Sequence, residues 1–149
     1  MALYSENRKA YFTYEILEKF QAGLALNGQE VKSIKSGRIQ LAGSYVMPQR
    51  EELFLVGAHV PAYQPANAPA DYNPERDRKL LLRKEEIRYL LGKAREKGLT
   101  LVPLRVYSEK RNLKLELALA RGKKKEDKRE VIRKREAERE IERALKMRR

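Results

Sequence analysis

The 149-residue sequence predicts a small, mainly β protein with antiparallel strands, few helices and a basic C-terminal tail. Three observations predict this class: stretches that alternate apolar and polar residues, turn residues between them, and a highly charged end without proline. Antiparallel strands can close into a barrel, and small barrels of this kind often bind oligonucleotides. The six expected strands cover residues 14–26, 29–36, 44–48, 52–58, 100–106 and 113–120.

The longest expected strand covers residues 14–26, in which the even-numbered positions are apolar with one exception. Gly23 lies within it and is typical of a bend, as at a barrel corner. Asn27 and Gly28 follow, a pair that predicts a two-residue hairpin turn. The returning strand would be 29–36, which carries polar residues on both of its faces.

The remaining elements follow from the same signals. Residues 44–48 and 52–58 predict a second hairpin around PQRE, and residues 60–74 predict a loop because they hold four of the six prolines. Residues 84–97 predict a helix, since apolar side chains recur at helical spacing and Gly98 follows. The apolar stripe of this helix consists of Ile87, Leu90, Leu91 and Ala94. The last two strands are joined by a turn at SEKRN.

The charge of the chain favours a polyanionic partner. Lys and Arg number 34 against 21 Asp and Glu, a formal net charge of +13. Residues 121–149 hold 14 of the basic and 7 of the acidic residues, so the rest of the chain is basic as well. Cysteine is absent, which excludes disulfide and thiolate chemistry and suits a cytoplasmic protein. No apolar run approaches the ~18–20 residues that cross a bilayer, so we expect no membrane partner.

The motifs of catalysis are weak. The single histidine, His59, reads as an ordinary residue at a strand end, and no nucleotide-binding glycine motif occurs. Some metal-dependent nucleases place an acid two residues before a lysine, and both Glu30 with Lys32 and Asp77 with Lys79 fit this fragment. No further cluster of carboxylates completes such a site. We therefore expect neither an enzyme nor a metal or cofactor, with a nuclease as a remote alternative.

Two stretches carry stronger signals for binding. NGQEVKSIKSGR places cations and hydroxyls together, which suits phosphates and sugars, although a solvated edge strand would look the same. NPERDRKLLL places Arg76, Arg78 and Lys79 before three leucines. One leucine can lie on the surface and pack against a base, although a fully buried short strand is the alternative. NRKAYFTY adds basic residues beside aromatic ones, a mixture that suits RNA.

The stretches GLALNGQEVKSIKSGR, SYV, NPERDRKLLL, LLGKAREKGLTLVPLRVY and LARGKKKEDKR occur in an order that resembles the SmpB family, the protein partners of transfer-messenger RNA. The resemblance implies an OB-like, six-stranded barrel over 1–120 and a basic tail over 121–149. It implies binding to the tRNA-like domain of that RNA, replacement of the anticodon arm in the decoding centre of the small ribosomal subunit, and a tail in the vacant mRNA channel. Elongation factor Tu would share the delivery complex, with one protein monomer for each RNA.

The resemblance also assigns residues. The RNA-binding set is Asn7, Gln21, Glu30, Lys32, Ser33, Lys35, Arg78, Lys79 and Leu81. The ribosome-binding tail set is Gly122, Lys123, Lys124, Asp127, Lys128, Arg129, Arg133, Lys134 and Arg135. Two positions depart from the family pattern: Gln21 stands where relatives commonly carry Glu, and Phe12 stands where many carry His. A structural ribosomal-type protein that binds rRNA remains the alternative function.

The tail itself predicts a helix of marginal stability. Glu130 with Lys134 and Glu142 with Lys146 are favourable pairs four residues apart, each contributing about 0.2–0.5 kcal/mol. The apolar stripe is thin and cannot supply a core, so an isolated helix is marginal in water. It consists of Ala137, Ile141, Ala144 and Leu145. We expect a tail that is disordered alone and helical when bound; a charged helix docked on its own barrel is the alternative.

Overall fold

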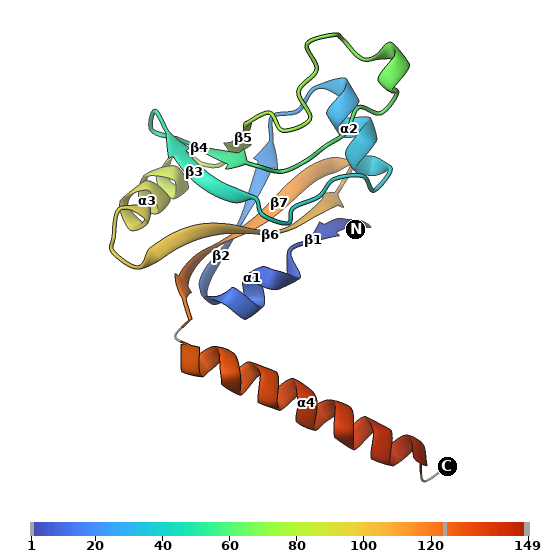
Figure 1. Ribbon diagram of the computed structural model, residues 1–149. Coiled ribbons are helices and arrows are strands. Elements are labelled where there is room, and N and C mark those ends of the chain that lie inside the picture. The colour runs from blue at the N-terminus through green and yellow to red at the C-terminus, as the bar shows by residue number, and fades with distance from the viewer. Residues whose placement is uncertain (1, 124, 148–149) are drawn as a thin grey trace.

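The computed structural model describes residues 2–123 and 125–147, with the side chains of the last helix described for 132–144 (Figure 1). Seven antiparallel strands form one curved sheet in the order β1-β6-β7-β2-β5-β4-β3, and β3 also lies against β6. The strands are β1 (Ala2–Glu6), β2 (Tyr14–Leu24), β3 (Tyr45–Gln49), β4 (Glu52–Val56), β5 (Arg78–Leu81), β6 (Leu99–Glu109) and β7 (Asn112–Gly122). The helices are α1 (Arg8–Thr13), α2 (Gly28–Lys35), α3 (Lys84–Ala94) and α4 (Lys125–Met147), with a 3-10 turn η1 at Pro65–Asn67.

The predicted class, mainly antiparallel β with a few helices, is confirmed, but the sheet has seven strands where six were expected. The loop at 60–74 and the helix that begins at Lys84 are confirmed, and the helix ends at Ala94. Two of the three predicted turns between strands, at PQRE and at SEKRN, are observed, and each places two consecutive residues at positive φ. These turns match the right-handed twist of the strands they join.

The predicted strand at 29–36 is wrong, since these residues form helix α2. Asn27 is not a hairpin residue but the N-cap of this helix: its side chain accepts a hydrogen bond from the Glu30 N–H at 2.9 Å. The Glu30 carboxylate in turn accepts from the Asn27 N–H at 2.9 Å, which completes a capping box. Ser33 and Ile34 lie three and four residues after Glu30, so all three buried side chains share one face of the helix. This explains why the segment has polar residues on both faces when it is taken as a strand.

Strands β1 and β5 were not among the six predicted, because both are short and depend on distant partners. β1 pairs with β6, about a hundred residues further along the chain. β5 pairs with β4 and, through Leu80 and Leu81, with the end of β2. A short strand at RKLLL was only an alternative in the sequence, and β1 pairs with a strand so distant that no turn between them signals the pairing.

The core has two parts, one on each face of β6 and β7. The larger cluster holds the inward leucines of β7, confirming the alternation seen in the sequence; it includes Leu113, Leu115, Leu117 and Leu119 with Leu53, Leu55, Leu80 and Leu90. A smaller cluster joins α1 to the other face and consists of Ala10, Val102, Leu104, Ala118 and Ala120. Because α1 covers the alanines of β7, both faces of this strand are buried at its C-terminal end.

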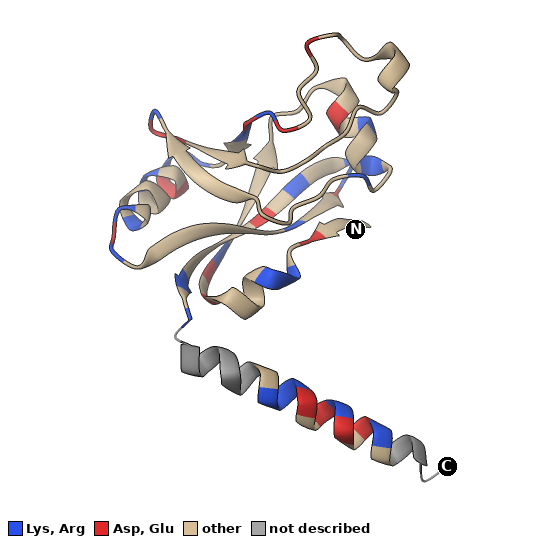
Figure 2. Ribbon diagram, viewed as in Figure 1, with Lys and Arg blue, Asp and Glu red and all other residues tan. Residues whose placement is uncertain are grey.

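Helix α4 extends away from the sheet and approaches it only near α1 (Figure 1). Its described side chains, from 132 to 144, are all exposed, with Ile132 at 42% and Ile141 at 61%. Figure 2 shows Lys and Arg interleaved with Glu along this part of the helix. Within the described residues, no helix combines the length and the apolar character that a membrane span requires.

Candidate RNA interface

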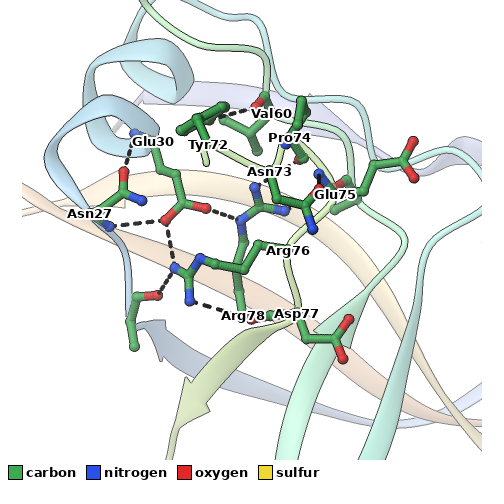
Figure 3. A network of polar contacts seen from close by, with 12 residues as sticks. Asn27, Glu30, Val60, Tyr72, Asn73, Pro74, Glu75, Arg76, Asp77 and Arg78 are labelled. Atoms are coloured by element: carbon green, nitrogen blue, oxygen red, sulfur yellow. Dashed lines mark hydrogen bonds and ion pairs between the residues drawn. The ribbon is translucent and has the colours of Figure 1, made fainter. Parts of the chain in front are cut away.

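The two binding motifs of the sequence meet at a buried carboxylate. Glu30 of α2 is fully buried and accepts hydrogen bonds from Arg76 Nη2 at 2.6 Å and from Arg78 Nε at 2.5 Å (Figure 3). The Arg78 side chain is also fully buried, whereas Arg76 is partly exposed. Buried charges are stable only when they are paired and hydrogen-bonded, and both conditions hold here.

The arginines of this network reach beyond Glu30. Arg78 donates from Nη1 to the Ala58 carbonyl and from Nη2 to the Pro74 carbonyl, each at 2.9 Å. Arg76 donates to the carbonyl of Ala25 at 3.1 Å. The network therefore joins α2, the end of β2, the segment before the proline-rich loop and the start of β5.

The proline-rich loop is closed at its base by further hydrogen bonds. The Val60 N–H donates to the Pro74 carbonyl at 2.9 Å, and the Tyr72 hydroxyl donates to the Val60 carbonyl at 2.7 Å. Gln29 of α2 accepts from the Tyr63 N–H at 3.0 Å. The loop and the first turn of α2 are thus held together, and β5 leaves this junction in a fixed direction.

The charge state of Glu30 follows from these contacts. Burial raises the pKa of the carboxyl, but hydrogen bonds from Arg76, Asn27 and Arg78 and the charge of Arg78 act in the opposite direction. The balance holds the pKa of Glu30 below its ordinary value of 4.5. Glu30 is therefore ionised at neutral pH and acts as the anionic centre of a structural network.

Three residues of the predicted RNA-binding set are thus turned inward. Glu30, Ser33 and Arg78 are each 0% exposed, so their side chains do not face solvent in this structure, and their part in RNA binding stays a prediction. The physical reason for their burial is the helical period of α2 and the alternation of β5, which direct these side chains into the core. The Ser33 hydroxyl is buried without a hydrogen-bond partner among the described residues.

The two acids of the nuclease alternative, Glu30 and Asp77, lie in different surroundings. Glu30 is occupied by two arginines, and the Asp77 carboxylate is exposed and accepts a hydrogen bond from Gln49 at 3.1 Å. Among the residues that the structure describes, no group of three His, Asp or Glu side chains converges on a metal position. His59 lies in a short bridge with Gln40 and its Nδ1 is 3.6 Å from a Glu75 carboxylate oxygen.

Two residues of the RKLLL motif, Lys79 and Leu81, face outward. Along β5, Arg78 and Leu80 are buried, whereas Lys79 is half-exposed and Leu81 is 51% exposed. Lys79 forms a surface ion pair with Glu52 at 2.9 Å. Of the two alternatives open from the sequence, a surface leucine is therefore the one observed, and the leucine is Leu81.

Leu81 lies in a row that crosses three strands. Gly23 of β2 pairs with Leu81 of β5 on one side and with Lys114 of β7 on the other. A Cβ at Gly23 would lie 3.2 Å from the Leu81 Cβ, so glycine permits the close approach of the leucine. Because Gly23 has no side chain, the surface between the exposed Leu81 and Lys114 is recessed at this position.

Two hollows of about 290 and 570 Å³ flank this row, and both include Gly23, Leu81 and Lys114. We call this surface the Leu81 face; it comprises Gln21, Gly23, Lys35, Leu81, Arg83, Arg111 and Lys114. Gln21 is exposed there and donates a hydrogen bond to Glu109. Cations around an exposed apolar side chain on a rigid sheet suit a nucleotide chain, since phosphates and bases then meet matching groups.

The remaining predicted residues lie elsewhere. Asn7 is partly buried and holds α1 on β6: its N–H donates to the Leu104 carbonyl at 2.7 Å and its amide to the Pro103 carbonyl at 3.0 Å. Lys32 is exposed on α2, outside both hollows. The structure therefore brings only Gln21, Lys35 and Leu81 of the predicted set onto the Leu81 face.

The tail residues divide in the same way. Gly122 ends β7, and Lys123 bonds to α1. Of the predicted tail residues on α4, those whose side chains are described are Arg133, Lys134 and Arg135, and all three are exposed. Lys124 lies outside the described residues, and the side chains of Asp127, Lys128 and Arg129 do as well.

Arg111 and Lys114 were missed by the sequence reasoning. The alternation of β7 predicts that Lys114 points away from the leucine core, but many lysines in this chain do so. Only the register of β7 against β2 places Lys114 beside Gly23. The missing signal is therefore strand pairing, which a single sequence does not contain.

The fold and the Leu81 face define a small antiparallel β protein whose surface suits a polyanionic, nucleotide-containing partner. The sequence profile of the SmpB protein family matches residues 4–147, so the chain belongs to the SmpB family.

Relatives support this membership along the whole chain. The SsrA-binding protein of Acaryochloris marina is 51% identical over 142 residues, covering 95% of this chain and 92% of the relative. The SsrA-binding protein of Carboxydothermus hydrogenoformans is 53% identical over 144 residues, covering 97% and 96%. A chain from the solved structure described as "tmRNA-SmpB: a journey to the center of the bacterial ribosome" superposes with a TM-score of 0.66 at 46% identity, covering 87% of this chain and 94% of that one.

Proposed function

We propose that this chain is an RNA-binding adaptor of trans-translation, which binds the tRNA-like domain of SsrA RNA, the transfer-messenger RNA, and delivers it to ribosomes stalled without message. Membership of the SmpB family and relatives named SsrA-binding proteins support the RNA partner. The similar chain from a tmRNA-SmpB structure of the bacterial ribosome supports the ribosomal setting. The structural observation that carries the proposal is the exposed Leu81, seated beside Gly23 and Lys114.

The Leu81 face binds the RNA by shape and charge together. Lys35, Arg111 and Lys114 neutralise phosphates, and counterion release makes this attraction strong and dependent on salt. Leu81 packs against a ribose or an unstacked base, which gives the contact a defined position. The buried Glu30 network contributes indirectly, because it fixes the direction in which β5 presents Leu81.

The tail acts on the ribosome rather than on the SsrA RNA. Exposed cations on α4 suit a channel lined by rRNA phosphates, and the interleaved glutamates favour a helix within it. In this proposal the body of the protein replaces the missing anticodon arm in the decoding centre, while the tail enters the empty mRNA channel. The adaptor acts in the cytoplasm as one copy per RNA, with elongation factor Tu in the same complex and without catalysing a reaction.

We further propose that the tail folds into α4 on the ribosome and is largely disordered without it. The exposure of Ile132 and Ile141 supports this, since little apolar surface is buried to stabilise the helix. Circular dichroism of a peptide spanning 121–149 in physiological salt should show only a minor helical fraction. A fully formed helix in that peptide would contradict the coupling of folding to binding.

A filter-binding comparison tests the choice of RNA. The probes are the tRNA-like domain of SsrA RNA and an rRNA fragment of equal length, measured at the same salt concentration. At least tenfold tighter binding to the tRNA-like domain supports the adaptor. Equal binding to both would favour the structural ribosomal-type protein and overturn the proposal.

Matched variants locate the binding face. Leu81→Ala should weaken binding roughly tenfold, as expected when about 1.5 kcal/mol of apolar packing is lost. Leu3→Ala is its control, because Leu3 is also exposed, at 53%, and lies on β1 outside the Leu81 face. Lys114→Gln should weaken binding and lower the salt slope by about 1, whereas the exposed Lys97→Gln should change neither. Equal losses in the matched pairs would place the RNA on another face.

A further inference from the structure

Lys123 begins the cationic run of the tail, yet its side chain points toward the body of the protein. Its Nζ donates a hydrogen bond to the Tyr11 carbonyl at 2.9 Å, and its backbone N–H donates to the Thr13 carbonyl at 3.1 Å. Both acceptors belong to the last turn of α1, where carbonyl groups have no partner within the helix. A cation is favoured at this end of a helix, so the contact satisfies both groups.

The helix that receives Lys123 is itself held firmly. Asn7 anchors its start through two hydrogen bonds to the backbone of β6. Ala10 is 3% exposed and packs in the smaller core cluster with Val102 and Ala118. The carbonyls that Lys123 contacts therefore move with the sheet and offer a fixed point of attachment.

The position of Lys123 in the chain gives this contact its consequence. Gly122 is the last residue of β7 and pairs with Tyr14, and α4 begins at Lys125. Lys123 thus makes the last described contact with α1 before α4 starts. The cations Arg133, Lys134 and Arg135, by contrast, are exposed on α4.

Further along, α4 passes close to α1 again. A cleft between the two helices is lined by Arg8, Lys9 and Phe12 from α1 and by Arg135 and Arg139 from α4. Four cations share this cleft, and like charges at close range repel each other. The charges in this cleft therefore do not favour the approach of α4 to α1, whereas the two hydrogen bonds of Lys123 hold the start of the tail against α1.

We propose that Lys123 is a positioning residue, which fastens the start of the tail to the C-terminal end of α1 and so sets the direction in which α4 leaves the sheet. In the sequence, Lys123 resembles the first phosphate-binding residue of the tail. In the structure, its amino group is hydrogen-bonded to the Tyr11 carbonyl instead. The attachment of the tail by Lys123 does not depend on the proposed function, whereas its effect on ribosome rescue rests on that function.

The absence of cysteine makes the attachment directly measurable, because two introduced cysteines are the only labelling sites. Spin labels at Glu85→Cys, an exposed position on α3, and at Lys125→Cys, the first residue of α4, report the distance between the body and the start of the tail, whether or not the rest of the tail is folded. Adding Lys123→Met, which keeps the length of the side chain and removes its donors, should at least double the width of the distance distribution. Lys134→Met is the control, because it removes the same charge from an exposed site and should leave the width unchanged.

Two results of this measurement overturn the proposal. One is a Lys123→Met distribution as narrow as that of the parent. The other is a parent distribution already as broad as that of the variant, which would mean that the tail is not fastened. Lys123→Arg should restore most of the narrow distribution, since a guanidinium can reach the same carbonyls.

A second measurement separates positioning from phosphate binding. Lys123→Met should leave the affinity for SsrA RNA within twofold of the parent, and should lower peptide tagging on stalled ribosomes about tenfold. Lys134→Met should lower tagging less than threefold. Equal losses for the two variants would show that Lys123 is one phosphate contact among several. If the parent chain neither binds SsrA RNA nor supports tagging, the proposed function fails, and the label distances still decide whether Lys123 fastens the tail.

Discussion

The buried network around Glu30 and the exposed helix α4 are both rich in charge, yet they use charge in opposite ways. In the network, the buried carboxylate of Glu30 on α2 meets the guanidinium groups of Arg76 and Arg78 at the start of β5. In α4, the described side chains from 132 to 144 all face solvent. Removing one charged partner should therefore destabilise the fold in the Glu30 network, whereas removing a charge from α4 should change only the protein surface.

This contrast explains why the residues of a family motif cannot all be taken as contacts with RNA. EVKS and RKLLL each contain residues that build the network and residues that face solvent. Arg78 and Lys79 are neighbours in the chain, but the former is buried and the latter forms a surface ion pair. A residue can thus be required for RNA binding because it holds the binding face in place, without touching the RNA.

The largest effect on stability is expected from Glu30→Gln. An amide cannot neutralise Arg78, which would remain as a buried charge without its partner, so the free energy of unfolding should fall by about 3–5 kcal/mol. Glu52→Gln is the matched control: its ion pair with Lys79 is 42% exposed on each side and should contribute less than about 1 kcal/mol. Urea unfolding of both variants measures the difference.

Similar losses in the two variants would contradict the contrast between buried and exposed pairs. If Glu30→Gln does not fold, Arg76→Gln provides a milder version of the same test. It removes a partly exposed guanidinium and leaves the pair of Glu30 with Arg78 intact. The expected loss is then smaller than for Glu30→Gln but larger than for Glu52→Gln.

Acid should weaken the network around Glu30. Because the pKa of Glu30 is lower in the folded protein than its ordinary value of 4.5, its ionisation stabilises the fold fully at pH well above 4.5. This contribution is lost as the pH falls through the depressed folded-state pKa. The difference in unfolding free energy between the parent and Glu30→Gln should be constant near neutral pH and should shrink below pH 4.5. A difference that does not change with pH would contradict an ionised Glu30.

Ser33→Ala should have a small effect on stability, opposite in sign to that of Glu30→Gln. The Ser33 hydroxyl is buried without a partner among the described residues, so its removal should leave stability unchanged or raise it by up to about 1 kcal/mol. Affinity for SsrA RNA should also be unchanged, because Ser33 is 0% exposed. A clear loss of RNA affinity with normal stability would instead indicate that α2 opens to present this side chain.

The smallest effect on stability, with the largest effect on function, is expected from removing residues 124–149. The deletion keeps Lys123 and removes a helix whose described side chains are exposed, so the free energy of unfolding should change by less than about 0.5 kcal/mol. Affinity for SsrA RNA should persist, because the Leu81 face is intact, while tagging on stalled ribosomes should be lost. Loss of RNA affinity on truncation would show that the tail shares in RNA capture.

Much of the fold could be predicted because long periodic stretches carry their own signal. The alternating leucines of β7 and the helical stripe of α3 are of this kind. Helix α2 was mistaken for a strand because Asn27-Gly28 also fits a hairpin turn. Asn27 followed three residues later by Glu30 fits a capping box equally well, and the burial of Ile34 and Ser33 decides for the helix.

The candidate site could be predicted only in part, for a related reason. Gln21, Lys35 and Leu81 were expected on the RNA-binding surface and lie on the Leu81 face, although their contacts with RNA stay a prediction. Lys114 and Arg111 were not foreseen, because they are far from Leu81 in the chain and reach it through the pairing of β7 with β2.

By itself, the sequence determined the mainly β class, the basic character of the chain and the helical tendency of the tail. These are properties of composition and of local periodicity, which each segment carries with it. Only the tertiary structure decided which motif residues face inward and which face solvent. Strand pairing placed Leu81 beside Gly23 and Lys114, and the packing of α2 buried Glu30 against Arg78. Such decisions depend on contacts between distant segments, where the free energy of burial outweighs any local preference.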